Sequence, residues 1–370
     1  MADTKLRVGV VFGGRSGEHE VSLAGAASVM AALDRSRFEV VPIGIDRSGR
    51  WLVGGDPMRA LGEDAARRAL VEGGPEATTK RELLERAAAL DTGTALAKTE
   101  SSESLPPGLR QSLDVVLIML HGPQGEDGTI QGLLELAAVP YTGAGVLASA
   151  IGMDKAAMKD MFRAHGLPVV DHLLVKRHEW RRDPGAVERA VVEQIGFPCF
   201  VKPANLGSSV GVSKVKAAED LVAAVDLAAS HDRRILVERA VEGREIEVAV
   251  LGNDEPMASL PGEVSYAGEW YDYETKYGSG QTTFKVPAAL SPEVTERVRA
   301  LAIQAFQAID GAGMARVDFF VEPDGRVLVN EINTIPGFTA TSAYPRLWEA
   351  SGIPYPELIA RLIELALERR

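Results

Sequence analysis

Short runs of β-branched and aliphatic residues recur along the first third of the chain, with Ala-rich stretches between them. "LRVGVVF" and "FEVVPIGI" flank a helix expected from near Glu20, and "DVVLIML" at 114–120 precedes a helix expected from about Thr129. Strands that alternate with helices favour parallel βαβ units. We therefore expect an N-terminal α/β domain over residues 1–150, built on a doubly wound parallel sheet.

An Ala-, Glu- and Arg-rich segment at 56–112 interrupts this domain and ends in "KTESSESLPPG". Its pattern predicts helices followed by a loop. We interpret it as an insertion of low functional content.

Residues 151–240 show shorter strands and helices. The expected strands are "DHLLVK", "PCFVKPA" and "RILVERAV", and helices are expected over 154–165, near 184–195 and near 217–230. This mixture predicts a small central α+β domain.

The remaining residues, 241–370, predict a third domain. Its pattern gives a strand "EIEVAVLG", a polar loop at 265–283, a helix over 291–309, a hairpin "ARVDFFVEPDGRVLVNEIN" and a final amphipathic helix. We find no internal repeat or heptad array in the sequence, which argues against a coiled-coil scaffold.

Length and charge narrow the possible functions. A chain of 370 residues exceeds what one hydrophobic core usually supports, so a cleft between domains is expected. The net charge of −12 gives no overall attraction for nucleic acid or an anionic membrane, so neither is expected as a partner.

The single Cys199 is expected to pack as a small hydrophobe. Because no signal peptide or membrane span is apparent, we expect a cytoplasmic protein.

The stretch "VKPANLGSSVGVSKV" at 201–215 places Lys202 just before a loop rich in Gly and Ser. Such a loop can wrap a phosphate, because glycine lets the backbone approach closely and successive N–H groups form a concave donor surface. Gly and Ser also dominate ordinary turns, so a tight hairpin between two strands is the alternative.

The hairpin at 314–333 permits a calculation of register. If Asp324-Gly325 is a two-residue type I′ loop, Asp318 faces Glu331 and Arg316 faces Asn333. Two carboxylates and an amide oxygen on one face suit Mg²⁺. A solvated face with an Arg–Asp pair is the alternative, but the same calculation places Phe320 and Val329 on this face, so we expect it to be partly buried.

Two common nucleotide motifs are absent from the sequence. It contains no G-x-x-x-x-G-K-[ST], and the first βα turn, "FGGRSGEHE", lacks the G-x-G-x-x-G spacing. The helix that follows still starts at the edge of the sheet where α/β domains bind ligands, which makes Glu20 a candidate ligand contact. An ordinary first-turn acid that stabilises the helix dipole is the alternative for this residue.

These stretches, together with "HGPQGEDGTIQG", "PYTGAGVLASAIGMDK", "YDYETKY" and "NEINTIPGFTATS", resemble the D-alanine–D-alanine ligases of the ATP-grasp superfamily over nearly the full length. The resemblance implies a three-domain ATP-grasp fold with ATP between two antiparallel sheets, two Mg²⁺ ions with Mn²⁺ as an alternative, and a homodimer. It also implies an acyl phosphate formed from one D-alanine and attacked by the amine of a second, for peptidoglycan precursor synthesis.

The resemblance further implies a role for each matching residue. Lys155, Lys202 and Lys276 would contact ATP phosphates, Ser208 and Ser209 would lie in a flap over the nucleotide, Glu238 would accept from adenine, and Glu245 would bind the ribose. Asp318, Glu331 and Asn333 would ligate the metal ions. Substrate contacts would come from Glu20, Ser208, Tyr277, Arg316, Gly337 and Ser342, with His121 in a supporting role.

Three alternatives stay open from the sequence. A D-alanine–D-lactate type ligase is the nearest, although Tyr277 resembles the dipeptide-forming type. Another ATP-grasp carboxylate–amine ligase is the second. A nucleotide-binding regulatory module is the third, but it would not need Arg316 as an oxyanion donor.

Overall fold

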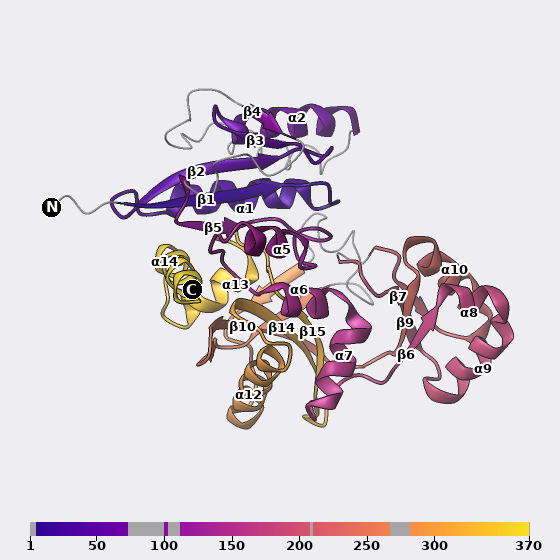
Figure 1. Ribbon diagram of the computed structural model, residues 1–370. Coiled ribbons are helices and arrows are strands. Elements are labelled where there is room, and N and C mark those ends of the chain that lie inside the picture. The colour runs from indigo at the N-terminus through magenta and orange to yellow at the C-terminus, as the bar shows by residue number, and fades with distance from the viewer. Residues whose placement is uncertain (1–4, 73–99, 103–111, 208–209, 267–281, 370) are drawn as a thin grey trace.

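In a computed structural model, the described residues form three β-sheets, which follow one another along the sequence (Figure 1). The structure describes residues 5–72, 100–102, 112–207, 210–266 and 282–369. Most of the insertion at 56–112 and the loop at 265–283 therefore lies outside the described residues.

The first sheet has the strand order β4-β3-β2-β1-β5. The central strands β2, β1 and β5 run parallel, as predicted, whereas β3 and β4 add an antiparallel edge. The strands are β1 (Leu6–Gly13), β2 (Phe38–Ile45), β3 (Trp51–Val53), β4 (Glu100–Ser102) and β5 (Val115–Ile118). The helices of this part are α1 (His19–Ala32), α2 (Pro57–Glu72), α5 (Thr129–Leu136) and α6 (Val146–Met153).

The second sheet is small and antiparallel, with the order β6-β9-β7-β8. Its strands are β6 (His172–Lys176), β7 (Cys199–Pro203), β8 (Ser213–Val215) and β9 (Arg234–Arg239), accompanied by α8 (Arg177–Arg182), α9 (Pro184–Gln194), a 3₁₀ turn (Ala218–Asp220) and α10 (Leu221–His231). Cys199 is fully buried in the core beneath this sheet, which confirms that it packs as a hydrophobe. Burial raises the pKa of its thiol to about 11.

The third sheet is antiparallel and has the order β13-β12-β10-β14-β15, with β11 paired to β10. Its strands are β10 (Arg244–Gly252), β11 (Met257–Ala258), β12 (Gly262–Tyr266), β13 (Thr282–Lys285), β14 (Gly313–Val321) and β15 (Val327–Asn333). One face packs on α7 (Lys155–Ala164) and α12 (Pro292–Ala308). The last helices, α13 (Ala343–Ala350) and α14 (Tyr355–Glu368), share a core with the first sheet.

Capping residues explain where the long helices begin. Asp154 accepts hydrogen bonds from the N–H groups of Ala156 and Ala157 at the start of α7. Ser291 caps α12 in the same way, and Pro292 follows as its first residue. A short polar side chain before a helix satisfies backbone donors that would otherwise lack partners. The start of α7 is therefore fixed, and with it the direction of the lysines on its first turns.

Within the part of the chain that the structure describes, no helix combines the length and apolar character needed to cross a membrane.

Candidate active site between the sheets

Two adjoining cavities lie where the three sheets meet. The first lies between the second and third sheets, and the second extends from there toward the N-terminus of α1 and to α13. Both cavities are lined by Lys155, Gly207, Glu247, Arg316 and Glu331. A ligand in one cavity would therefore lie directly beside a ligand in the other.

The hairpin of β14 and β15 supplies the floor shared by both cavities. Its register pairs Asp318 with Glu331 and Arg316 with Asn333, which confirms the predicted partners. The predicted turn was wrong, however. Of Asp324 and Gly325, only Gly325 has a positive φ, at 86°, whereas a type I′ loop needs positive φ at both positions.

A three-residue loop, Pro323 to Gly325, joins the strands instead. Glu322 and Arg326 are the closing pair, since Glu322 N donates to Arg326 O at 2.9 Å. The longer loop shifts the register by one residue, and a β-bulge shifts it back between Asp318 and Phe319. Asn330 is the extra residue in this bulge.

The shift also corrects the predicted neighbours on the cavity face. Val329 pairs with Phe319 and is buried in the core beside the helices, so its assignment to the cavity face was wrong. Leu328 lies opposite Phe320 in its place. The face is nonetheless partly buried, since Arg316 and Asp318 side chains are 19% and 16% exposed.

The acids of the hairpin are each held by a cation of the chain. Arg316 binds both oxygens of Asp318 at 2.7 Å, and its Nε lies 3.4 Å from Glu247 Oε1. Although burial opposes it, the pairing with Asp318 and Glu247 raises the pKa of Arg316. Lys155 Nζ lies 3.3 Å from Glu331 Oε2 and also donates to Leu206 O at 3.2 Å.

The set of carboxylates fits a small oxygen-preferring cation. Among the described residues no three His, Cys, Asp or Glu side chains cluster as a metal site. The set at the hairpin is instead two carboxylates, Asp318 and Glu331, and the amide of Asn333, whose Oδ1 accepts from Ile335 N at 3.0 Å. Carboxylate and amide oxygens suit Mg²⁺, and the cations now bound to both acids show that positive charge is favoured there.

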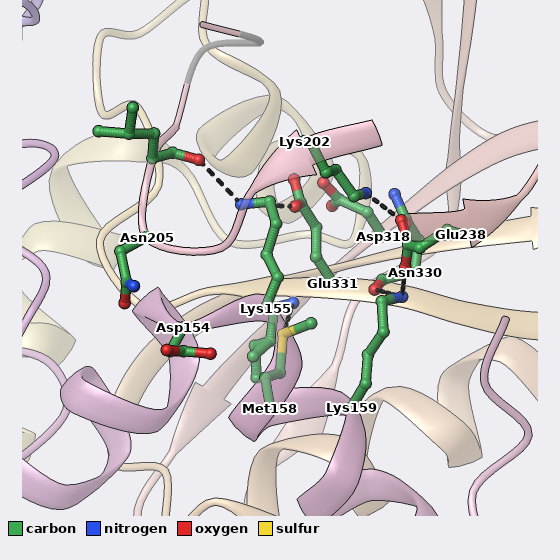
Figure 2. A network of polar contacts seen from close by, with 12 residues as sticks. Asp154, Lys155, Met158, Lys159, Lys202, Asn205, Glu238, Asp318, Asn330 and Glu331 are labelled. Atoms are coloured by element: carbon green, nitrogen blue, oxygen red, sulfur yellow. Dashed lines mark hydrogen bonds and ion pairs between the residues drawn. The ribbon is translucent and has the colours of Figure 1, made fainter. Parts of the chain in front are cut away.

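Glu238 forms a buried ion-pair cluster with two lysines (Figure 2). Lys202 contacts Glu238 Oε2, and Lys159 Nζ lies 2.7 Å from Oε1. Burial would raise the pKa of Glu238, but the two ammonium groups outweigh it and lower that pKa to about 2. Lys202 lines the first cavity, as does Glu245 on β10, whereas Glu238 does not line it.

The acid that lines the second cavity at the N-terminus of α1 is Glu18, two residues before the predicted Glu20. Glu20 forms an ion pair with Arg47 and does not line the second cavity. Glu18, which directly precedes α1, lines it instead. The Glu18 carboxylate lies close to Gly122 and Gly207. A Cβ added at Gly122 would lie 2.9 Å from Glu18 Oε2, and one added at Gly207 would lie 3.6 Å from the same atom.

His121 lies beside Glu18 at the wall of the same cavity. Its Nδ1 lies 3.4 Å from Glu126 Oε1 and 3.1 Å from Ile335 O, while Nε2 is buried with no hydrogen-bond partner among the described residues. Burial opposes it, but Glu126 raises the pKa of His121. The imidazole ring is therefore held through Nδ1, and Nε2 is the nitrogen left to contact a ligand.

The opposite wall of the second cavity is formed by the N-terminus of α13. Gly337 and Ser342 both line it, and Ser342 Oγ accepts from Thr339 N at 3.1 Å. Arg346, one turn further along α13, also lines it and donates to Phe284 O at 3.0 Å. In the described part of the chain no carboxylate pairs with Arg346, so its charge is available to an anionic ligand.

Four predicted residues, Ser208, Ser209, Lys276 and Tyr277, lie outside the described residues. Sequence reasoning missed Glu18, Lys159 and Arg346. Lys159 lies four residues after Lys155, so the helical period places both on one face of α7, and this signal was present in the sequence.

Comparison with known proteins identifies the family. Residues 7–144 match the family described as "D-ala D-ala ligase N-terminus", and residues 161–364 match "D-ala D-ala ligase C-terminus". The chain is 47% identical to a D-alanine–D-alanine ligase of Geobacillus kaustophilus over 365 residues, which cover 99% of this chain and 95% of that one. It is 48% identical to one of Deinococcus radiodurans over 369 residues, covering 99% and 100%.

Two solved structures are similar over almost the whole chain. The D-alanine–D-alanine ligase of Coxiella burnetii has a TM-score of 0.76 at 38% identity, covering 99% of this chain and 94% of that one. VanG D-Ala:D-Ser ligase of Enterococcus faecalis has a TM-score of 0.80 at 31% identity, covering 98% and 100%. The chain belongs to the D-alanine–D-alanine ligase family.

Proposed function

We propose that the protein joins two D-alanines to D-alanyl-D-alanine, converting ATP to ADP and phosphate, for peptidoglycan precursor synthesis. The observation that carries this proposal is the set of five residues shared by the two cavities, beside which a nucleotide phosphate in one cavity would meet an amino-acid carboxylate in the other. Incubation with ATP, Mg²⁺ and D-alanine tests it. Dipeptide and phosphate should appear in equal amounts.

The cavity between the two antiparallel sheets would hold ATP. Lys155 and Lys202 line it and would neutralise the phosphates, together with Lys276. Glu245 would bind the ribose hydroxyls. Glu238 would accept from the adenine amino group, for which it would have to give up its present contact with Lys202. Ser208 and Ser209 would close over the nucleotide as a flap.

Asp318, Glu331 and Asn333 would hold Mg²⁺, and we propose two ions, with Mn²⁺ as an alternative. When bound, the metal would offset the charge of the triphosphate as it meets a carboxylate. Arg316 and Lys155 would then exchange some of their present carboxylate partners for phosphate oxygens.

The second cavity would hold the first D-alanine. We propose that Glu18, rather than Glu20, binds its ammonium group, since Glu18 faces the cavity and Glu20 is paired with Arg47. His121 would contact the same substrate through Nε2. The substrate carboxylate oxygen attacks the γ-phosphorus, the bond to ADP breaks, and an acyl phosphate forms.

The second D-alanine would enter beside α13. Ser342 and Arg346 would bind its carboxylate, and its amine attacks the acyl carbon. Arg316 and the Gly337 N–H would stabilise the oxyanion that forms at the acyl oxygen. The C–O bond to phosphate then breaks, phosphate leaves, and the amine loses its proton to solvent.

Tyr277 and Ser208 would complete a hydrogen-bonded cluster with the acid at the N-terminus of α1. We propose that this cluster favours an amine acceptor over the hydroxyl of D-lactate. We also propose that the segment 265–283 closes over the bound substrates as a lid and carries Lys276 and Tyr277 to the site.

Three further properties complete the proposal. Because the reaction would consume ATP and feed cell-wall synthesis, we expect it to take place in the cytoplasm. The protein would act as a homodimer, which light scattering on the purified chain tests. Its domains would be residues 1–150, 151–240 and 241–370.

A further inference from the structure

Lys159 is a fully buried lysine that connects two sheets. It lies on α7, its exposed fraction is 0%, and its Nζ lies 2.7 Å from Glu238 Oε1 on β9 and 2.7 Å from Asn330 O on β15 (Figure 2). β9 belongs to the second sheet and β15 to the third. A buried ammonium group is costly unless it is paired and hydrogen-bonded, and here both acceptors lie on the sheets that enclose the first cavity.

The carbonyl that Lys159 binds belongs to the bulge. Asn330 is the extra residue between the pairs Asp318–Glu331 and Phe319–Val329, so it has no partner residue across the ladder. Helix α7 also contacts the next part of β15, since Ile332 N donates to Met158 Sδ at 3.3 Å. Helix α7 therefore stabilises the irregular backbone that keeps Glu331 opposite Asp318.

The other partner of Lys159 holds Lys202. Glu238 divides its two oxygens between the lysines, one buried and one at the cavity. Without Lys159, the Glu238 carboxylate would be free to turn toward Lys202 alone, and the ammonium of Lys202 would no longer be held at a fixed distance from β15. Lys159 itself lines neither cavity and has no access to a ligand.

We propose that Lys159 is a positioning residue for the nucleotide site, which sets the spacing of the second and third sheets and fixes both Lys202 and Glu331 in the cavity between them. This inference rests on the proposed function in one respect, that ATP binds in this cavity. It adds a residue that acts on the nucleotide only through Glu238 and the Asn330 carbonyl.

The test is calorimetric binding of ADP with Mg²⁺ to the full chain and to Lys159→Met, which keeps the length of the side chain and removes the ammonium group. Loss of a residue that orients metal ligands typically lowers metal affinity or activity by about 10- to 100-fold, and by analogy we expect a rise of this size in the dissociation constant of ADP. The KM for D-alanine should rise less than the dissociation constant of ADP, because Lys202 lines the first cavity alone, whereas Glu331 lines both. Lys159→Gln is the second variant if Lys159→Met does not fold, with the same loss expected.

Trp180→Phe is the matched control. Trp180 is also buried and donates to a carboxylate, Asp226 at 2.7 Å, but it lies in the core of the second sheet away from the cavity. Nucleotide affinity like that of the unsubstituted chain in a folded Lys159 variant would overturn the inference, as would an equal loss in Trp180→Phe. Failure of the unsubstituted chain to bind ADP would instead contradict the proposed function.

Discussion

Asp318 lies directly opposite Glu331 across β14 and β15, and each of these carboxylates is bound by a different cation of the chain. Arg316 binds Asp318 and Lys155 binds Glu331. Acids brought this close repel each other unless positive charge lies between or beside them. The same geometry that needs Arg316 and Lys155 in the free chain would favour Mg²⁺ when ATP is bound.

Replacing Glu331 by Gln should abolish most ligation and leave the fold intact. The variant removes one charge from the metal-binding set, and loss of a single group that stabilises transition-state charge costs about 100- to 1,000-fold in kcat. Steady-state phosphate release measures the kcat of the variant. Glu322→Gln is the control, because Glu322 lies on the same hairpin, pairs with Arg239 and Arg326, and lines neither cavity. Full activity in Glu331→Gln would remove the metal assignment.

Glu18→Gln and Glu20→Gln should have different effects. Glu18 faces the cavity, so its substitution should weaken binding of the first D-alanine by about 10- to 100-fold, the range for one hydrogen bond to a charged group. Glu20→Gln breaks the ion pair with Arg47 and should lower stability with little change in KM. Initial rates over a range of low D-alanine concentrations give the KM of both variants. A raised KM in Glu20→Gln with an unchanged KM in Glu18→Gln would instead identify Glu20 as the contact to the first D-alanine.

Gly325→Ala should lower the free energy of unfolding by about 1 kcal/mol and leave kcat unchanged. Gly325 has φ 86° and no atom within 4 Å of an added Cβ, so the cost is backbone strain alone. Gly325→Asn should cost less, because Asn tolerates this conformation. Urea unfolding compares the three chains, and equal stability of the Ala variant would contradict the three-residue loop.

Acid should weaken the cluster of Glu238 and the two lysines. The pKa of Glu238 is lowered from 4.5 to about 2 in the folded chain, where Lys159 and Lys202 hold it ionised against the effect of burial, so its stabilising contribution is present above pH 4.5 and is lost as the pH falls toward 2. The double variant Lys159→Met/Glu238→Gln lacks this group. Urea midpoints between pH 6 and pH 3 should therefore fall more steeply in the unsubstituted chain, and parallel curves would contradict the buried ion pair.

Tyr277→Phe should shift acceptor choice toward D-lactate. Loss of one hydrogen bond near the acceptor changes the free energy by about 0.5–3 kcal/mol, which corresponds to roughly twofold to a hundredfold in relative use. The effect should be largest at mildly acidic pH, where the competing amine is protonated. Product ratios with D-alanine and D-lactate mixed test this, and an unaltered ratio would remove Tyr277 from the specificity argument.

Much of the fold could be predicted from the sequence, because the apolar runs are long and the caps are distinct. The strands β1 and β2 and the helices α7 and α12 lie where the pattern predicted them, within one or two residues. The short strands β3, β4 and β11 were missed, since two or three residues carry no readable alternation.

The hairpin has the predicted cross-strand contacts but a different turn. Asp-Gly predicted a two-residue loop, but Pro323 extends the loop by one residue and the bulge at Asn330 compensates. A bulge depends on tertiary partners such as Lys159, and the local sequence does not show them. Glu20 was predicted as the ligand contact because α1 was expected to begin near that residue, whereas it begins at His19. The exact first residue of α1 decides which acid faces the cavity, and helix ends are the least certain part of a sequence-based prediction.

The most direct test of the account is the product analysis of the purified chain with ATP, Mg²⁺ and D-alanine, with L-alanine, D-serine and D-lactate as alternative acceptors in parallel. We predict one D-alanyl-D-alanine and one phosphate for each ATP consumed, with D-alanine the preferred acceptor. Phosphate release without dipeptide, or a preferred acceptor other than D-alanine, would contradict the assignment of the two cavities to ATP and two D-alanines.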